Sequence, residues 1–210
     1  MPIESVIFDC DGTLVDSETL TQEVLVDFVG EFDVVLTLEE ALAEFTGGHM
    51  ADVVRALEVR RGSALPETFV AEFRRRMTDA FRERLRPIDG ASELLAGIRQ
   101  PCSVASSGPR EKIELSLSLT GLRHYFEDRI FSAYEVGSWK PEPDLFLHAA
   151  EAQGVAPDRC AVVEDSLPGV QAGLAAGMRV YAFGPTIRGD LPTGATRIRH
   201  LSELASRFAG

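Results

Sequence analysis

Two carboxylates separated by one residue follow the first apolar run of the sequence. Asp9 and Asp11 come directly after Val6, Ile7 and Phe8, and Gly12 comes next. Residues two apart in an extended chain point to the same side, so both carboxylates should face one region. There, one carboxylate can attack phosphorus and the other can protonate a leaving oxygen.

More polar residues follow the later apolar runs. They are Ser106, Ser107 and Gly108 after the second, Lys140 past the third, and Glu164 and Asp165 after the fourth. Ligands of open parallel sheets bind at the carboxyl ends of the strands, so these residues should share one rim. The hydroxyl of Ser106 and the amides of Ser107 and Gly108 could bond phosphoryl oxygens, while Lys140 adds positive charge.

Carboxylates gathered at one place repel one another and need a cation to stay ionised together. Oxygen ligands of this kind suit Mg²⁺. The sequence therefore predicts a Mg²⁺ site from Asp9, Asp11, Glu164 and Asp165. Taken singly, each residue has a simpler explanation as a turn or helix cap, and Asp16 with Ser17 is expected to cap a helix.

The elements that position these residues follow an alternating pattern. Continuous apolar runs at 6–8, 102–105, 129–131, 160–163 and 179–183 predict strands covered on both faces. Helical patterns at 144–153 and 169–178 lie between the later runs, whereas the apolar spacing at 111–119 fits a helix or a strand. This alternation predicts an α/β fold with a doubly wound parallel sheet.

About ninety residues separate the first two strands, far more than one crossover helix requires. Helical patterns at 20–32, 38–45, 50–58 and 67–85 occupy that stretch, and Pro87 and Gly90 follow it. We expect an inserted all-helical domain at 17–85, with a catalytic core formed by 1–16 and 86–210. Such an insert can close as a lid.

The composition of the chain disfavours some classes of binding partner. Against 33 Asp and Glu the chain has 21 Lys and Arg, a formal charge of −12, which disfavours nucleic acid and anionic membrane surfaces. No apolar stretch is long enough to span a membrane, and the start has no signal-peptide pattern. Cys10, Cys102 and Cys160 are expected to be buried thiols. We expect a cytoplasmic protein, a monomer or weak homo-oligomer, that binds a small phosphorylated metabolite.

The order of these motifs resembles a known family. Asp-x-Asp-Gly-Thr at 9–13, Ser106, Lys140-Pro141 and Glu164-Asp165 are similar to the haloacid dehalogenase-like hydrolase superfamily. The helical insert and the segment 163–178 resemble its β-phosphoglucomutase and sugar-phosphatase branch. The resemblance implies a Rossmann-like core with a helical cap and an Mg²⁺-dependent reaction through an aspartyl-phosphate.

The resemblance also implies a role for each motif residue. Asp9 would be the nucleophile and a metal ligand, and Asp11 the general acid and base and a ligand through its carbonyl. Asp165 would be the third metal carboxylate, with Glu164 beside it as a ligand or as support. Ser106 and Lys140 would hold the phosphoryl group.

Several members of the superfamily fit less well. The second Asp of the first motif disfavours a dehalogenase, and the absence of Lys from 17–85 disfavours a phosphonate hydrolase. β-Phosphoglucomutases carry a cap Arg and a His where this chain has Met50 and Thr21. A mutase must bind an intermediate with two phosphates, and this chain lacks the charged contact to the second one. Hydrolysis is therefore favoured, with the mutase as the alternative.

The runs at 106–109, 124–126, 131–134 and 139–141 look like those of 6-phosphogluconate phosphatases. We therefore predict an Mg²⁺-dependent phosphatase of small phosphorylated sugars or sugar acids. Gly47, Gly48 and His49 are expected to form a substrate-binding cap loop, or else a plain helix–helix turn. The non-enzymatic alternatives are a receiver-like phospho-acceptor and a silent phosphosugar-binding protein.

Overall fold

The structure is a computed structural model of residues 1–210 that describes every residue except 1, 47, 49, 185, 186, 188, 209 and 210. The chain divides into two compact units. One comprises residues 1–15 and 86–210, and the other comprises residues 16–85. Each unit is described by itself below.

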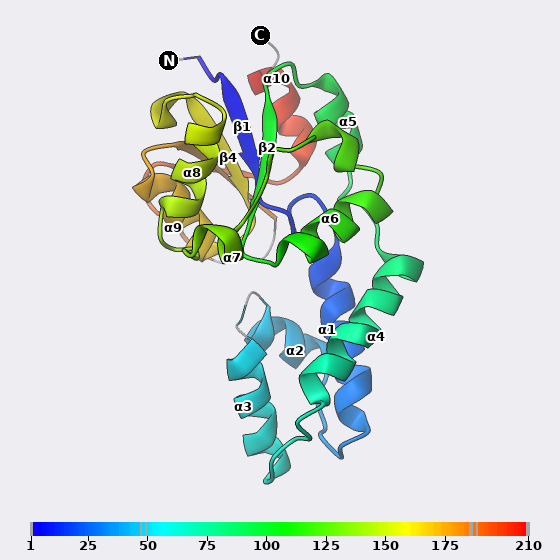
Figure 1. Cartoon of the computed structure of the whole chain (residues 1–210). Helices are drawn as coiled ribbons and strands as arrows, with labels where there is room; N and C mark the ends of the chain where they lie inside the picture. Colours follow the sequence, from blue (N-terminus) through cyan, green and yellow to red (C-terminus); the bar gives the residue numbers. More distant parts are fainter. Residues whose placement is uncertain (1, 47, 49, 185–186, 188, 209–210) are drawn as a thin grey trace. The chain divides into compact units, whose positions relative to one another are not determined.

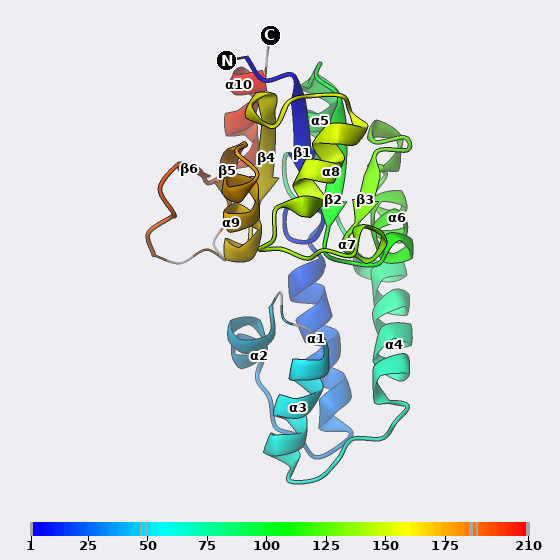
Figure 2. The same cartoon turned by 60° about the vertical axis from the view of Figure 1, so that its left-hand side comes forward.

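The first unit is built on a parallel sheet. Within the described residues, its strands are β1 (Ser5–Phe8), β2 (Cys102–Ser106), β3 (Ile130–Ser132), β4 (Cys160–Glu164), β5 (Arg179–Phe183) and β6 (Ala195–Ile198). Their spatial order is β3-β2-β1-β4-β5-β6, and every neighbouring pair is parallel. Figure 2 shows β3 toward one edge and β6 toward the other. The predicted doubly wound α/β class is confirmed.

Helices cover both faces of this sheet. They are α5 (Ala91–Gly97), α6 (Arg110–Leu119), α7 (Ala133–Val136), α8 (Asp144–Ala152), α9 (Leu167–Ala175) and α10 (Ala205–Phe208), with short 3-10 turns η1 (Arg123–Tyr125), η2 (Pro157–Arg159) and η3 (Leu201–Leu204). Helices α8 and α9 lie on one face, and α5, α6 and α10 lie on the other (Figure 1). Ile7 and Val162 face the first group in one buried core, whereas Phe8 packs edge-to-face on Phe126. Burial on both faces explains the continuous apolar runs of the strands.

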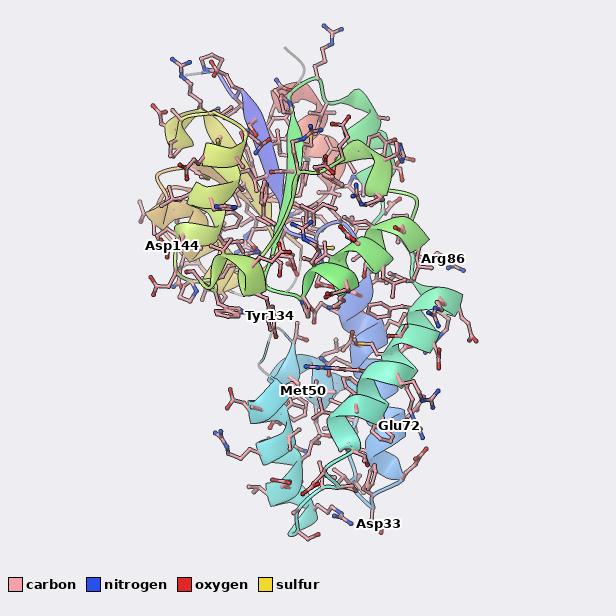
Figure 3. All side chains as sticks on the ribbon, in the orientation of Figure 1. Asp33, Met50, Glu72, Arg86, Tyr134 and Asp144 are labelled. Carbon is pink, nitrogen blue, oxygen red and sulfur yellow. The ribbon has the colours of Figure 1, made fainter. Side chains whose placement is uncertain are left out.

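The second unit is a helical bundle of α1 (Ser17–Gly30), α2 (Leu38–Phe45), α3 (Met50–Arg61) and α4 (Phe69–Arg84). Phe28 of α1 stacks on Phe69 of α4, with ring centroids 4.9 Å apart. Arg76 of α4 lies over the Phe28 ring and pairs with Glu31 at 2.6 Å. These contacts join α1 to α4, and Figure 3 shows Glu72 on the same helix, α4.

The structure differs from the predicted elements in one additional strand and in one helix cap that lacks its hydrogen bond. Strand β6 lies at the sheet edge with Thr196 and Arg197 exposed, so it lacks the apolar run that marked the buried strands. Asp16 occupies the N-cap position of α1, as expected, but its side chain makes no capping hydrogen bond. The three cysteines are buried and unpaired, as predicted. In the described residues, no helix is both long and apolar enough to cross a membrane.

Candidate active site

Register places the first motif at the centre of the sheet. Phe8, the last residue of β1, pairs with Val104 of β2 and with Val163 of β4. The backbone N–H of Asp9 donates to the carbonyl oxygen of Val163 at 2.9 Å. Asp9 therefore starts between the ends of two neighbouring strands, where ligands of parallel sheets bind.

Lys140 joins Asp9 to Glu164. Its Nζ lies 2.5 Å from Asp9 Oδ1 and 2.6 Å from Glu164 Oε2, and its side chain is 5% exposed. Burial alone lowers the pKa of Lys140, but the charges of Asp9 and Glu164 outweigh it and raise that pKa above its usual value. Burial and the charge of Glu164 raise the pKa of Asp9 despite Lys140. One ammonium is thus insufficient for these carboxylates.

The second carboxylate oxygen of Glu164 has its own partners. Oε1 accepts hydrogen bonds from the backbone N–H groups of Asp165 and Ser166, both at 3.0 Å, and from the Ser166 hydroxyl at 2.8 Å. Gly169 is required next to it, because a Cβ there would lie 1.9 Å from Glu164 Oε2. Glu164 therefore fixes both Lys140 and the turn that leads into α9.

An acidic cluster forms where β1 and β4 end. Asp9, Glu164 and Asp165 are all buried, and one carboxylate oxygen from each lies within 4.8 Å of the others. Thr13 donates to Asp165 Oδ1 at 3.3 Å. Gly12, with φ of 77°, lets the chain pass Asp165 so closely that a Cβ would lie 2.2 Å from Oδ2. Oxygen ligands in this arrangement fit a hard divalent cation.

Formal charges agree with that fit. Asp9, Asp11, Glu164 and Asp165 carry four negative charges when ionised. The lysines that contact this group, Lys112 and Lys140, carry two positive charges. Counted over these six described groups alone, the difference is −2, which one divalent ion would neutralise. The donor set and its charge therefore fit Mg²⁺.

The loop after β2 supplies hydrogen-bonding groups. Ser106 is buried, and its Oγ accepts the N–H of Gly108 at 3.1 Å, whereas Ser107 is exposed. Ser132, at the end of β3, donates to the Gly108 carbonyl oxygen at 2.6 Å and accepts from the Tyr134 N–H at 3.2 Å. The sequence analysis missed Ser132, which fixes the shape of this loop.

Lys112 of α6 was also missed. Its Nζ lies 3.0 Å from Oδ1 of Asp11. The composition carries a signal that could have found it, because Lys112 and Lys140 are the two lysines of the whole chain. Tyr134 lies on α7 (Figure 3) and is 58% exposed, and its ring packs edge-to-face on Trp139.

The predicted loop at 47–49 belongs to the helical unit, and Gly47 and His49 lie outside the described residues. Gly48 is exposed, and its N–H donates to the carbonyl oxygen of Phe45 at 3.0 Å. Met50 is the first residue of α3, as Figure 3 shows. The hydroxyl of Thr21 lies 3.7 Å from the sulfur of Met77. The substrate-binding roles of 47–49 stay predictions.

A parallel α/β core with a buried acidic cluster at the ends of its strands is typical of hydrolases that act on phosphate esters. Comparison with known proteins identifies the family. The haloacid dehalogenase-like hydrolase family matches residues 6–183. The chain is 37% identical to the 6-phosphogluconate phosphatase of Escherichia coli, over 96% of this chain and 93% of that one.

Two crystal structures have similar folds. One is a haloacid dehalogenase family hydrolase from Deinococcus radiodurans with bound phosphate and sodium. Its TM-score is 0.82 at 31% identity, and the match covers 99% of this chain and 98% of that chain. A putative β-phosphoglucomutase from Thermotoga maritima has a TM-score of 0.82 at 25% identity, covering 97% of each chain.

The chain therefore belongs to the haloacid dehalogenase-like hydrolase family. The predicted resemblance and the predicted enzyme class, a phosphoric monoester hydrolase of this family, are both confirmed.

Proposed function

We propose that this protein is an Mg²⁺-dependent phosphatase of small phosphorylated sugars or sugar acids that works through an aspartyl-phosphate. The observation that carries this proposal is the placement of Asp9. It directly follows the central strand β1, is buried with Glu164 and Asp165, and is held by Lys140. The serine loop and a second acid, Asp11, complete the set of groups that phosphoryl transfer requires.

In the first step, a carboxylate oxygen of Asp9 attacks phosphorus. The bond from phosphorus to the sugar oxygen breaks, and that oxygen takes its electron pair and a proton from Asp11. Lys140 stabilises negative charge on the transferring group, and the Ser106 hydroxyl and nearby amides bond its oxygens. The products of this step are the free sugar hydroxyl and an acyl phosphate on Asp9.

In the second step, water replaces Asp9. Asp11, now a carboxylate, takes a proton as the water oxygen attacks phosphorus. The bond between phosphorus and the Asp9 oxygen breaks, which returns the carboxylate and releases inorganic phosphate. Both steps use the same two acids, which accounts for their spacing.

Asp9, Asp165 and the carbonyl oxygen of Asp11 would hold Mg²⁺, which supplies charge that keeps the carboxylates ionised and draws electron density from the phosphoryl oxygens. Glu164 already accepts donors at both oxygens, so we propose that it supports the site by fixing Lys140 and the Asp165 backbone. The oxygen ligands of the acidic cluster and its net negative charge support these assignments.

The substrate class rests on the relatives and on the helical unit. A relative at 37% identity is named for 6-phosphogluconate, a phosphorylated sugar acid. We propose that residues 17–85 act as a cap over a core of 1–16 and 86–210, with the 47–49 loop contributing to substrate choice. A small phosphorylated metabolite is therefore the proposed partner.

Free phosphate release tests this proposal. The purified protein with Mg²⁺ is given 6-phosphogluconate, hexose 6-phosphates, β-glucose 1-phosphate or nucleotides, each with an EDTA control. We expect metal-dependent release that is strongest with 6-phosphogluconate. Conversion of β-glucose 1-phosphate to glucose 6-phosphate without release would instead establish the mutase. The absence of turnover on all substrates would leave a binding or signalling protein.

A further inference from the structure

The ion pair between Lys112 and Asp11 joins parts of the chain that are 101 residues apart in sequence. Lys112 Nζ lies 3.0 Å from Asp11 Oδ1, and the two side chains are 27% and 15% exposed. Both residues belong to the α/β unit. The pair is therefore sheltered more than an ordinary surface ion pair, and it involves the proposed acid of the reaction.

The choice of lysine at this position is unusual for this chain. Of its 21 basic residues, 19 are arginine and two are lysine. Lys140 contacts Asp9, and Lys112 contacts Asp11, so each acid of the first motif has its own lysine. Arginine or histidine makes the other ion pairs found in the described part of the chain. Lysine presents a compact ammonium rather than a planar fork, which suits a single carboxylate oxygen.

Local helix preferences do not explain Lys112. It is the third residue of α6, in the first turn, where the helix dipole disfavours a positive charge. The contact with Asp11, made in the folded protein, explains why a lysine occurs at position 112. Lys112 lies four residues after Gly108, in the first turn of α6, so one helix start links the loop 106–108 to the acid.

Gly108 shows how closely these groups gather. A Cβ on Gly108 would lie 3.5 Å from Ser106 Oγ, 3.7 Å from Lys112 Cδ and 3.8 Å from Asp11 Oδ2. The phosphate-binding serine, the lysine and the acid therefore border one small space beside the glycine. Lys112 engages Oδ1, while Oδ2 of Asp11 faces this space.

We propose that Lys112 is a positioning residue that holds the carboxyl group of Asp11 where it can protonate the leaving oxygen. This inference rests on the proposed phosphatase function. It predicts that Lys112 matters most for substrates whose leaving group must be protonated, such as the alkoxide of a sugar phosphate. A p-nitrophenolate ion leaves without a proton and should depend little on Lys112.

The test compares two substrates in two variants. We expect Lys112→Met to lower kcat/KM by about 10- to 100-fold for the best sugar phosphate, less than the full contribution of acid catalysis, because Asp11 itself remains. For p-nitrophenyl phosphate, the same variant should lose no more than about 3-fold, because its departure needs no acid. Lys112→Arg, which keeps the charge, should recover part of the loss for the sugar phosphate.

Arg159→Met is the matched control. Arg159 pairs with Glu4 at 2.7 Å before β4, at the amino end of the sheet, and its loss removes the same charge. We expect both substrates to keep wild-type kcat/KM in this variant. An equal loss on both substrates in Lys112→Met would overturn the positioning role, as would no loss on either. Wild-type protein that releases phosphate from neither substrate would contradict the proposed function instead.

Chemical acetylation provides a test that does not depend on refolding a variant. Lys112 is the more exposed of the two lysines, because the Lys140 side chain is 5% exposed. Acetylation of the wild-type protein, mapped to Lys112 by mass spectrometry, should reproduce the selective loss on the sugar phosphate. Full activity toward the sugar phosphate after stoichiometric acetylation of Lys112 would overturn the proposal.

Discussion

Lys140 and Glu164 form a buried ion pair in which both oxygens of the carboxylate accept hydrogen bonds. One oxygen of Glu164 accepts the ammonium at 2.6 Å, and the other accepts two backbone N–H groups and a hydroxyl. The same ammonium contacts Asp9 at 2.5 Å. The geometry of the proposed nucleophile thus depends on a glutamate that lies 155 residues later in the sequence.

Removal of Lys140 should therefore destabilise the protein as well as inactivate it. Lys140→Met leaves two buried carboxylates without their ammonium, and we expect the free energy of unfolding to fall by about 3 kcal/mol in metal-free buffer. Denaturant unfolding measures this change. The double variant with Glu164→Gln should recover part of the loss, because it removes one of the uncompensated charges. Additive losses would show that the two residues do not interact.

Asp9→Asn should abolish phosphate release while the fold persists. The amide has nearly the shape of the carboxylate but cannot form an acyl phosphate, so kcat should fall by at least about 1,000-fold. Activity assays and circular dichroism together measure this effect. Substantial turnover by a folded Asp9→Asn variant would remove Asp9 from the nucleophile role.

Asp11→Asn should slow both departure of the sugar oxygen and attack by water. The loss should be about 100- to 10,000-fold in kcat for a sugar phosphate, since asparagine neither donates nor accepts the proton. Rapid-quench analysis should show phospho-enzyme that forms slowly or persists. Wild-type kinetics for formation and decay would refute the acid and base role.

Ser132→Ala should loosen the loop 106–108, which we propose binds the phosphoryl group. The substitution removes a donor to the Gly108 carbonyl oxygen and an acceptor of the Tyr134 N–H, in a side chain that is fully buried. We expect a loss of about 1–3 kcal/mol in stability and a raised KM for substrate. Ser138→Ala is the control, since Ser138 bonds the exposed Asp144. Equal effects of both variants on KM would contradict the anchoring role.

The buried thiols should make the protein sensitive to high pH. Burial raises the pKa of Cys102 to about 12 and that of Cys160 to about 11, from an ordinary value of 9.0. Because the unfolded thiols lose their protons first, their contribution to stability should be constant well below pH 9 and should fall as the pH rises from 9 toward 11. Denaturant unfolding across this range measures the slope.

Thiol labelling gives an independent check on the same groups. At pH 8 the native protein should react slowly, since few of these thiols are ionised or accessible, whereas denatured protein should react at all three cysteines. Rapid labelling of native Cys102 at pH 8 would contradict its raised pKa.

The fold was predictable because burial left a direct mark on the sequence. The five predicted runs match strands β1 to β5 within about a residue, since strands covered on both faces need apolar residues at every position. The edge strand β6 has no such requirement, because Thr196 and Arg197 face solvent. Its pairing with β5 depends on backbone hydrogen bonds, which side-chain types do not encode.

The acidic part of the site was predictable for a similar reason. The residues after each run must meet at one edge, so the neighbourhood of Asp9, Glu164 and Asp165 follows from topology. Lys112 was missed because it does not follow an apolar run. Ser132 was missed because the prediction for the run at 129–131 used Lys140, past the following loop, rather than the serine directly after the run. Their contacts with Asp11 and Gly108 depend on where α6 begins and where β3 ends.

The short bridge between Val15 and Pro87 has a consequence for folding kinetics. Within the α/β unit, these residues pair antiparallel, and Ile88 donates to the Leu14 carbonyl oxygen at 2.9 Å. Strand β1 can pair with β2 only after a loop of about ninety residues has closed, which is entropically slow. Contacts inside the intervening helices span shorter stretches, so that segment should acquire structure first. Once formed, it shortens the effective loop and speeds the pairing of the central strands.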